Sequence, residues 1–95
     1  MTIRDCIAPD RSPNIPNIKL PDGSIDTHVH IFEKEYPLFE GRGYNPPEST
    51  LNDLKYLHKQ LGISRVVYTQ PSPYGVDNSA ILKGIKVMNE ETPGR

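Results

Sequence analysis

The sequence predicts an α/β fold in which parallel strands alternate with helices, and three observations lead to it. Residues 25–32 alternate β-branched side chains with mostly ionisable ones at a period of two, as a strand with two different faces does. Residues 65–70 are continuously β-prone, which is typical of a parallel strand covered on both faces. Each of these runs is followed by apolar side chains at helical spacing. Strand, helix, strand, helix is the order of right-handed βαβ units.

The chain is expected to begin with an irregular, proline-rich leader over residues 1–22. The prolines in this segment have no backbone N–H, so they cannot donate the hydrogen bonds of a helix or of a strand ladder. Asp22-Gly23 then marks a turn into the first strand. Along that strand one set of side chains is predicted to point one way and the other set the opposite way: Ile25, Thr27, Val29 and Ile31 against Asp26, His28, His30 and Phe32.

A long connection, residues 33–49, precedes the first helix. Thr50 with Asp53 three residues later predicts an N-terminal capping box, and Gly62 predicts the C-terminal stop. The apolar stripe between them holds Leu51, Leu54, His58 and Leu61. Because His58 lies within this stripe, we expect it to be a partly buried structural histidine.

The second helix is expected to follow a stiff turn, residues 71–76, that contains Ser72 between two prolines. Asp77 is a plausible N-cap for this helix. The residues expected on its buried face are Ile81, Leu82, Ile85 and Met88.

Composition excludes several classes of partner. Eleven basic and twelve acidic side chains are mixed along the chain and give a formal charge of −1. The sequence therefore has no basic stripe of the kind that binds nucleic acid. The apolar runs are far shorter than the roughly 20 residues of a membrane helix, and the first residues lack the apolar core of a signal peptide. Cys6 is the only cysteine, so no intrachain disulfide is possible. A cytoplasmic protein is expected.

The strongest candidate for chemistry is the pair His28 and His30. Side chains two apart on a strand project from one face about 6.5–7 Å apart, so two imidazoles can converge on a metal ion, a water or a substrate carbonyl. A catalytic zinc site needs three protein ligands, of which this pair supplies two. The alternative is that the two histidines only satisfy each other or backbone carbonyls. Their place at the carboxyl end of a strand, before a long loop, favours a site.

Three further residues are candidates for binding an anionic ligand. Ser72 offers a hydroxyl at the end of the second strand, although a turn serine can also bond its own backbone. Arg42, between two glycines, suits carboxylate recognition, and the Tyr44 hydroxyl can complete such a site. Ordinary surface positions are the alternative for Arg42 and Tyr44.

Several segments together resemble a known family. They are Ile25-Asp26-Thr27-His28-Val29-His30-Ile31-Phe32, Tyr44-Asn45-Pro46-Pro47, Leu61-Gly62, Gln70-Pro71-Ser72 and Tyr74-Gly75-Val76-Asp77-Asn78. From about residue 21 to residue 95 the chain resembles the N-terminal portion of amidohydrolase-related proteins, in particular the 2-pyrone-4,6-dicarboxylate lactonase group.

The resemblance implies that residues 23–95 are the first two β/α units of a (β/α)₈ TIM-type barrel, incomplete in this chain. It implies hydrolysis of a carboxylated lactone, 2-pyrone-4,6-dicarboxylate-like or a sugar-acid lactone. His28 and His30 would lie around the scissile carbonyl, and Tyr44 and Ser72 would contact the substrate. The cofactor is either none or one divalent, zinc-like metal on His28 and His30. Because the family's water-activating Asp has no match here, the chain is expected to be inactive alone.

Two other functions stay open. One is a metal-dependent decarboxylase or hydrolase of the same superfamily. The other is a non-catalytic, truncated interaction module. Bare strand edges invite pairing with another chain, so self-association through open sheet edges is also possible.

Overall fold

A computed structural model describes residues 3–91 of the 95-residue chain. The strands are β1 (Arg4–Asp5), β2 (Ile25–Val29), β3 (Tyr44–Asn45) and β4 (Arg65–Tyr68). The helices are α1 (Leu51–Leu61) and α2 (Ser79–Glu91), with a short 3₁₀ turn, η1 (Ser72–Tyr74), between β4 and α2. Neither α-helix of this described part has the length and hydropathy that crossing a lipid bilayer requires.

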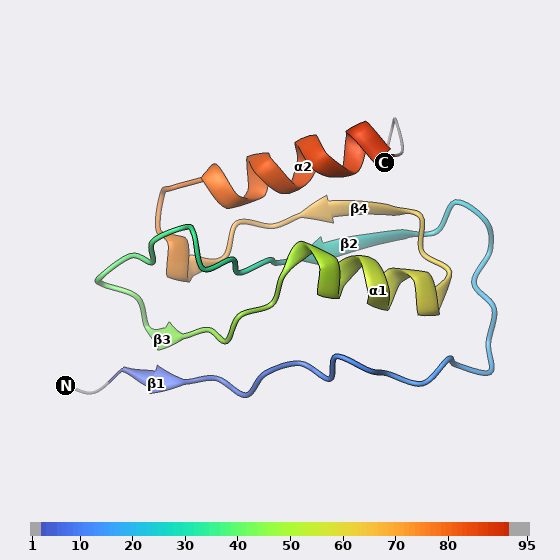
Figure 1. The fold of residues 1–95 in the computed structure, drawn as a ribbon, viewed down its shortest axis with the longest axis horizontal. Helices are drawn as coiled ribbons and strands as arrows, with labels where there is room; N and C mark the ends of the chain where they lie inside the picture. The colour runs from blue at the N-terminus through green and yellow to red at the C-terminus, as the bar shows by residue number, and fades with distance from the viewer. Residues whose placement is uncertain (1–2, 92–95) are drawn as a thin grey trace.

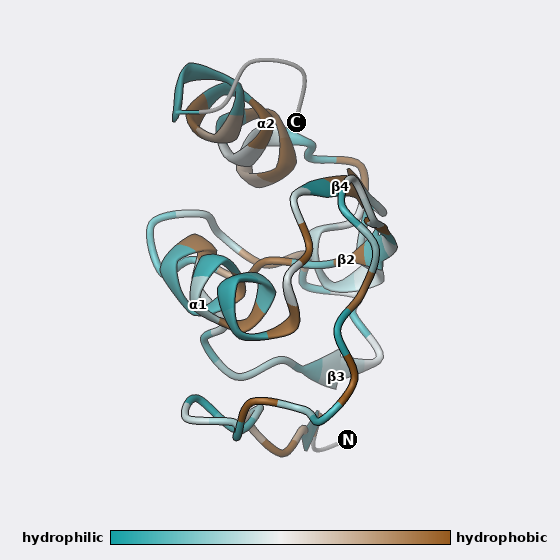
Figure 2. Ribbon diagram, turned by 90° about the vertical axis from the view of Figure 1, so that its right-hand side faces the viewer, coloured by the Kyte–Doolittle hydropathy of each residue, from teal (hydrophilic) through white to brown (hydrophobic). Residues whose placement is uncertain are grey.

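The central unit is a parallel pair of strands, β2 and β4, joined through α1. Figure 1 shows α2 running above β4 and α1 in front of β2. Figure 2, which looks along the strands, shows both helices on the same side of this pair. The carboxyl ends of β2 and β4 therefore lie at one end of the molecule, and the loops that leave them meet there.

The predicted barrel start is wrong as a description of this fold. The described residues form two separate two-stranded parallel sheets, β2–β4 and β1–β3, rather than one curved wall. The second sheet pairs Arg4 with Tyr44 and Asp5 with Asn45, and Figure 1 shows it to the lower left of α1. The alternation of strands and helices predicted the local order, but not that leader and loop would pair with each other.

The leader also differs from its expected irregular form at these two residues. The prolines of the leader begin at Pro9, so Arg4 and Asp5 keep the backbone donors that a ladder needs. The pairing continues as Cys6 N donates to Asn45 O at 2.9 Å, and Asn45 Nδ2 donates to Asp5 Oδ1 at 2.9 Å. Beyond Asp5 the leader runs as an extended chain along α1.

Helix α1 begins and ends where the sequence predicts. Thr50 Oγ1 accepts from Asp53 N at 3.1 Å, and Asp53 Oδ2 accepts from Thr50 N at 3.0 Å, which completes the capping box. The hydrogen bond from the Thr50 backbone is the main reason why the pKa of Asp53 is below its usual value. At the other end Gly62 takes a left-handed conformation, with φ 76°, and donates to His58 O.

Helix α2 buries a narrower face than its apolar residues suggested. Ala80, Gly84 and Met88 are buried, whereas the predicted core residues Leu82 and Ile85 are 62% and 39% exposed. Small side chains at two of the three buried positions let the helix approach the sheet closely. Asp77 lies ahead of the helix, where its Oδ1 accepts from Ser79 N at 2.9 Å.

The core of the described residues is small. Its fully or nearly fully buried apolar residues are Val29, Ile31, Tyr74, Ala80 and Met88. Tyr68 Oη donates to Met88 Sδ at 2.8 Å, which joins β4 to the last turns of α2. The Ile31 side chain lies against Gly84, so the end of β2 is held by the same helix.

Gly62→Ala is expected to lower the free energy of unfolding by about 1–2 kcal/mol, the cost of a left-handed conformation for a residue with a Cβ. A Cβ at Gly62 would meet no atom within 4 Å, so the loss is conformational rather than steric. Gly43→Ala is the matched control, because a Cβ there also meets nothing and its φ is not positive. Urea denaturation measures both variants, and equal effects would contradict the prediction.

Candidate active site

The carboxyl end of β2 brings the two histidines of the candidate site together. His28 Nε2 and His30 Nε2 are 3.3 Å apart, and the rings meet edge to face with centroids 4.9 Å apart. His28 is exposed and His30 is half-buried. Both ε nitrogens therefore point toward one place that solvent can reach.

Thr69, the residue directly after β4, fixes the tautomer of His30. His30 Nδ1 lies 2.8 Å from Thr69 O, and because a carbonyl oxygen only accepts, Nδ1 must be the donor. For neutral rings, His30 Nε2 then carries a lone pair and His28 Nε2 donates to it. The pair thus presents one N–H donor and one basic nitrogen side by side.

The spacing of the pair fits two ligands of one divalent metal ion. Two Zn–N bonds of about 2.0–2.1 Å at a tetrahedral angle hold their nitrogens about 3.3–3.4 Å apart, and the observed distance is 3.3 Å. The bond from His30 to Thr69 O is the outer contact that commonly orients a metal-binding imidazole. Within residues 3–91, no group of three or more His, Cys, Asp or Glu side chains gathers around a common point. The described part of the chain therefore offers two ligands.

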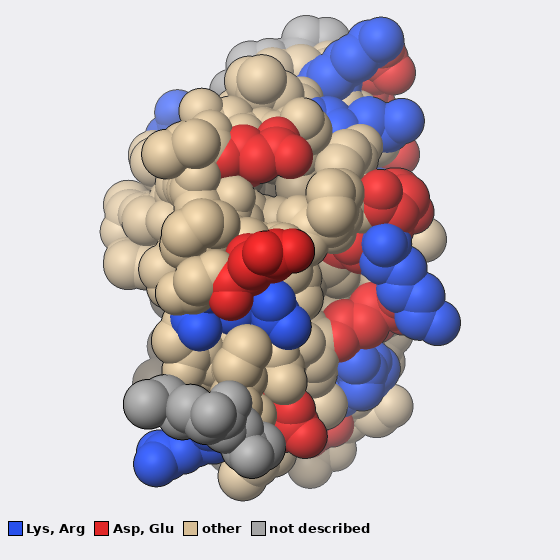
Figure 3. All heavy atoms as spheres, turned by 90° about the vertical axis from the view of Figure 1, so that its left-hand side faces the viewer, with Lys and Arg blue, Asp and Glu red and all other residues tan. Residues whose placement is uncertain are grey.

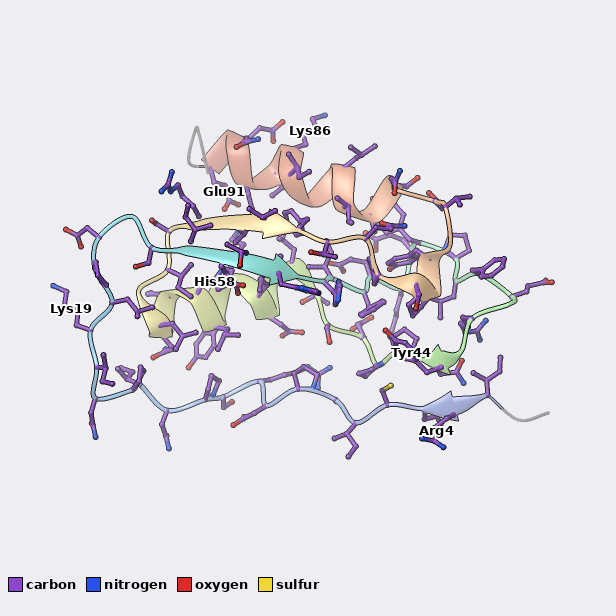
Figure 4. The ribbon with its side chains drawn as sticks, turned by 180° about the vertical axis from the view of Figure 1, so that it is seen from behind. Arg4, Lys19, Tyr44, His58, Lys86 and Glu91 are labelled. Atoms are coloured by element: carbon purple, nitrogen blue, oxygen red, sulfur yellow. The ribbon has the colours of Figure 1, made fainter. Side chains whose placement is uncertain are left out.

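Asp26 does not share the face of the histidines, contrary to the predicted alternation. β2 pairs Asp26 with Val66 and Val29 with Tyr68, so three steps along β2 match two along β4. One extra residue reverses the alternation of side chains. Asp26 Oδ2 consequently meets His58 Nε2 of α1 at 2.9 Å, and His58 is fully buried. Figure 4 labels His58 where α1 lies behind β2.

Arg42 is held in a fixed orientation by the loop after β2. Its Nε donates to Asn45 Oδ1 at 2.9 Å and its Nη1 to Phe39 O at 3.0 Å. The guanidinium lines a cavity of about 390 Å³. The other lining residues are Phe32, Glu33, Lys34, Tyr36, Pro37, Leu38, Pro46, Pro47, Glu48 and Tyr74. The cavity adjoins the histidine pair through Phe32, whose ring centroid is 6.4 Å from that of His30.

Tyr44 and Ser72 lie outside the lining of this cavity. Tyr44 is half-buried in β3, and Ser72 is exposed at the start of η1. The structure therefore unites His28 with His30 and places Arg42 in the lining of a cavity that Phe32 also lines. Tyr44 in β3 and Ser72 in η1 lie apart from this cavity, in the segments that follow β2 and β4. This end of the molecule carries both acidic and basic side chains on a mostly uncharged surface (Figure 3).

A set of contacts joins the loop after β2 to the loop after β4, and the sequence did not predict it. We call this set the brace. The buried Tyr74 hydroxyl accepts from Glu33 N at 3.0 Å, while its ring stacks on Phe32 with centroids 5.6 Å apart. Glu33 Oε1 accepts in turn from Leu51 N at 2.7 Å, in the first turn of α1. Gln70 Nε2 donates to the carbonyls of Gly75 and Asp77. These bonds join residues far apart in the chain or within an irregular turn, where periodicity carries no signal.

Tyr74→Phe is expected to change how stability depends on alkaline pH. Burial raises the pKa of the Tyr74 phenol above its usual 10.0. A raised pKa in the folded state gives stability that is fully present below pH 10 and is lost as pH rises through the folded pKa. The free energy of unfolding, measured in urea from about pH 8 to pH 11, should fall less steeply in Tyr74→Phe than in the wild type.

Tyr56→Phe is the control for this measurement, because Tyr56 is 44% exposed. It should keep the alkaline slope of the wild type. Identical slopes for all three proteins would contradict the role given to Tyr74. Below pH 10 the Tyr74→Phe protein should also be less stable by about 1 kcal/mol, because Glu33 N loses its acceptor.

No family model matches the sequence, but several curated proteins do. The chain is 37% identical over 83 residues to a 4-sulfomuconolactone hydrolase of Hydrogenophaga intermedia, covering 85% of this chain and 27% of that protein. It is 35% identical over 85 residues to a 2-pyrone-4,6-dicarboxylate hydrolase of Comamonas testosteroni, covering 87% and 28%. It is 33% identical over 81 residues to a D-galactarolactone isomerase of Agrobacterium fabrum, covering 83% and 28%.

A solved structure is similar as well. An apo crystal structure of an Agrobacterium tumefaciens protein superposes with a TM-score of 0.66 at 29% identity, over 86% of this chain and 30% of that chain. The chain thus spans between a quarter and a third of the length of these relatives. The three curated relatives are all named for reactions of lactones.

Proposed function

We propose that this chain contributes the histidine pair of a lactone hydrolase of the amidohydrolase superfamily. The observation that carries the proposal is the convergence of His28 Nε2 and His30 Nε2 at 3.3 Å, with His30 oriented by Thr69 O. The similarity to two kinds of lactone hydrolase supports the reaction class. A carboxylated lactone such as 2-pyrone-4,6-dicarboxylate is the proposed substrate.

In this proposal, water attacks the ring ester carbonyl, the bond between that carbon and the ring oxygen breaks, and the ring oxygen leaves as an enolate that takes up the proton lost by the water. The His28 Nε2–H, which faces His30 Nε2 in the free chain, would then be shared with the carbonyl oxygen, where negative charge develops in the transition state. A carboxylate activates the water. The two carboxylates nearest the pair in sequence have other roles: Asp26 accepts from His58, and Glu33 accepts from Leu51 N. Because the water-activating Asp of the resembled family has no match in this chain, we propose that the base comes from outside residues 3–91.

Substrate carboxylates are proposed to bind at the loops around the pair. Arg42 is the best placed, because two hydrogen bonds fix its guanidinium in the wall of a cavity large enough for a small ring. An Arg held in this way can bind a carboxylate with two parallel hydrogen bonds. Tyr44 and Ser72 would add hydroxyl donors as the substrate crosses from one loop to the other.

The metal-dependent form of the same reaction is a second candidate, favoured by the ligand-like spacing of the pair. His28 and His30 would hold the ion, which would polarise the carbonyl as a Lewis acid. Only the His28 tautomer would then differ, because its Nε2 would have to offer a lone pair as His30 Nε2 already does.

A chimera tests the proposal. The segment of the Comamonas testosteroni hydrolase that matches this chain is replaced by this chain, and hydrolysis of 2-pyrone-4,6-dicarboxylate is followed by the loss of pyrone absorbance. The chimera is expected to hydrolyse the pyrone, whereas the isolated chain is expected to be inactive. A chimera with a native circular dichroism spectrum but no hydrolysis would contradict the proposal.

A further inference from the structure

His58 is the most deeply buried polar side chain of the described residues, with 0% of its surface exposed. Its Nε2 lies 2.9 Å from Asp26 Oδ2, and its Nδ1 is buried without a hydrogen-bond partner. A buried polar atom left unpaired costs about 1–3 kcal/mol. An apolar side chain could fill this place without that cost, so packing alone does not account for an imidazole here.

The partner of His58 reaches the candidate site directly. Asp26 Oδ1 accepts from His28 N at 3.2 Å, while Oδ2 is the oxygen that meets His58. One carboxylate therefore links the buried imidazole of α1 to the backbone of the first histidine of the pair. The Asp26 side chain is 29% exposed. Its orientation therefore depends on these two hydrogen bonds more than on packing by surrounding atoms.

This linkage lies at the irregular step of β2. The extra residue falls between Asp26 and Val29, and His28 is inside that step. In this step the regular ladder does not define the position of His28, because strand pairing resumes only at Val29. The second histidine has its own anchor, since His30 Nδ1 bonds Thr69 O at 2.8 Å. His28 is thus the member of the pair whose place depends on Asp26.

We propose that His58 is a positioning residue that, through Asp26, fixes the irregular step of β2 and so holds His28 against His30. The importance of that pair for catalysis rests on the proposed function, but the positioning itself does not. His58 acts from the core on a residue of the site, and it touches neither the substrate nor the pair.

The test compares two replacements of nearly equal size and shape. His58→Gln keeps an N–H at the place of Nε2 that can donate to Asp26, and His58→Met does not. Histidine side chains are labelled with ¹⁵N in the full chain, and their ring signals are recorded by NMR at one fixed pH. In the wild type His28 should show separate signals for a protonated and an unprotonated ring nitrogen, as for a single tautomer.

His58→Met is expected to collapse this separation for His28 and to leave the His30 signals in place. His58→Gln is expected to preserve the wild-type pattern. Gly62→Ala serves as the control, because it destabilises the end of α1 without touching Asp26, and its His28 signals should be those of the wild type.

An unchanged His28 pattern in a folded His58→Met protein overturns the proposal, as does its loss in a folded His58→Gln protein. If His58→Met does not fold, Asp26→Ala decides, since it removes the same support from a partly exposed position. Collapse of the His28 separation in Asp26→Ala then supports the proposal, and its retention overturns it. Because no lactone is present, failure here is distinct from failure of the hydrolysis assay.

Discussion

His28→Ala and His30→Ala are each expected to lower kcat of the chimera for 2-pyrone-4,6-dicarboxylate by at least about 10²-fold, the usual contribution of one positioned proton donor or acceptor. In the proposed mechanism, His28→Ala removes the N–H that would donate to the carbonyl oxygen. His30→Ala removes the acceptor that holds the His28 ring at 3.3 Å. Neither change removes a buried apolar side chain, so circular dichroism and the unfolding midpoint should stay near those of the parent.

The control for this prediction is Cys6→Ser, in the exposed part of the leader. It should leave kcat and KM unchanged. A His28→Ala or His30→Ala chimera that keeps more than about a tenth of the parent kcat would contradict the role given to that histidine. An increase in KM with unchanged kcat would assign the pair to substrate binding rather than to the chemical step.

Ile31→Ala is expected to lower the free energy of unfolding by about 2–5 kcal/mol, the range for removing a large side chain from a packed core. Ile31 is 2% exposed, and its side chain, two residues beyond the end of β2, lies beside Gly84 of α2. Small domains have about 5–15 kcal/mol of stability in all. This single change therefore removes a large share of the stability, measured by urea denaturation.

Ile7→Ala is the matched control, because Ile7 is 97% exposed in the leader. It should change stability by no more than about 0.5 kcal/mol. Equal losses for Ile7→Ala and Ile31→Ala would show that the contact between Ile31 and α2 is not the centre of the core. Ile31 follows His30 directly, so loss of this contact should also loosen the end of β2 that carries the pair.

The parts of the fold that the sequence predicted well depend on local chemistry. The capping box of Thr50 and Asp53 and the stop at Gly62 act over three or four residues, and they set the bounds of α1. The two main strands also begin at the predicted residues, although β2 ends at Val29 and β4 at Tyr68, earlier than expected. The length of a strand depends on its partner, and residues beyond the shared ladder leave the sheet.

The parts that could not be predicted depend on contacts between distant segments. Nothing in Arg4-Asp5 or Tyr44-Asn45 indicates that they pair, and nothing in the apolar content of α2 distinguishes Met88, which is buried, from Leu82, which is not. The barrel was inferred from resemblance and from the order of elements. That order does not specify which strands share a sheet, and the two separate pairs show a different arrangement.

At the candidate site, the histidine pair could be picked out from its spacing, whereas its surroundings could not. A strict alternation placed Asp26 beside His28 and His30, and the irregular step of β2 moved it to His58 instead. One extra residue in a strand has no signature in the pattern of apolar side chains when the strand is five residues long. The brace from Tyr74 to Glu33 spans 41 positions and has no local signal.

The most direct test of the central claim, that His28 and His30 act together on one lactone carbonyl, is a double-mutant cycle on kcat of the chimera. The rates of the parent, His28→Ala, His30→Ala and the double variant are compared for 2-pyrone-4,6-dicarboxylate. Residues that act as one unit are strongly non-additive. We therefore predict that the double variant is no slower than the slower single variant. A double variant slowed by the product of the two single effects would show that the histidines act independently and would contradict the account.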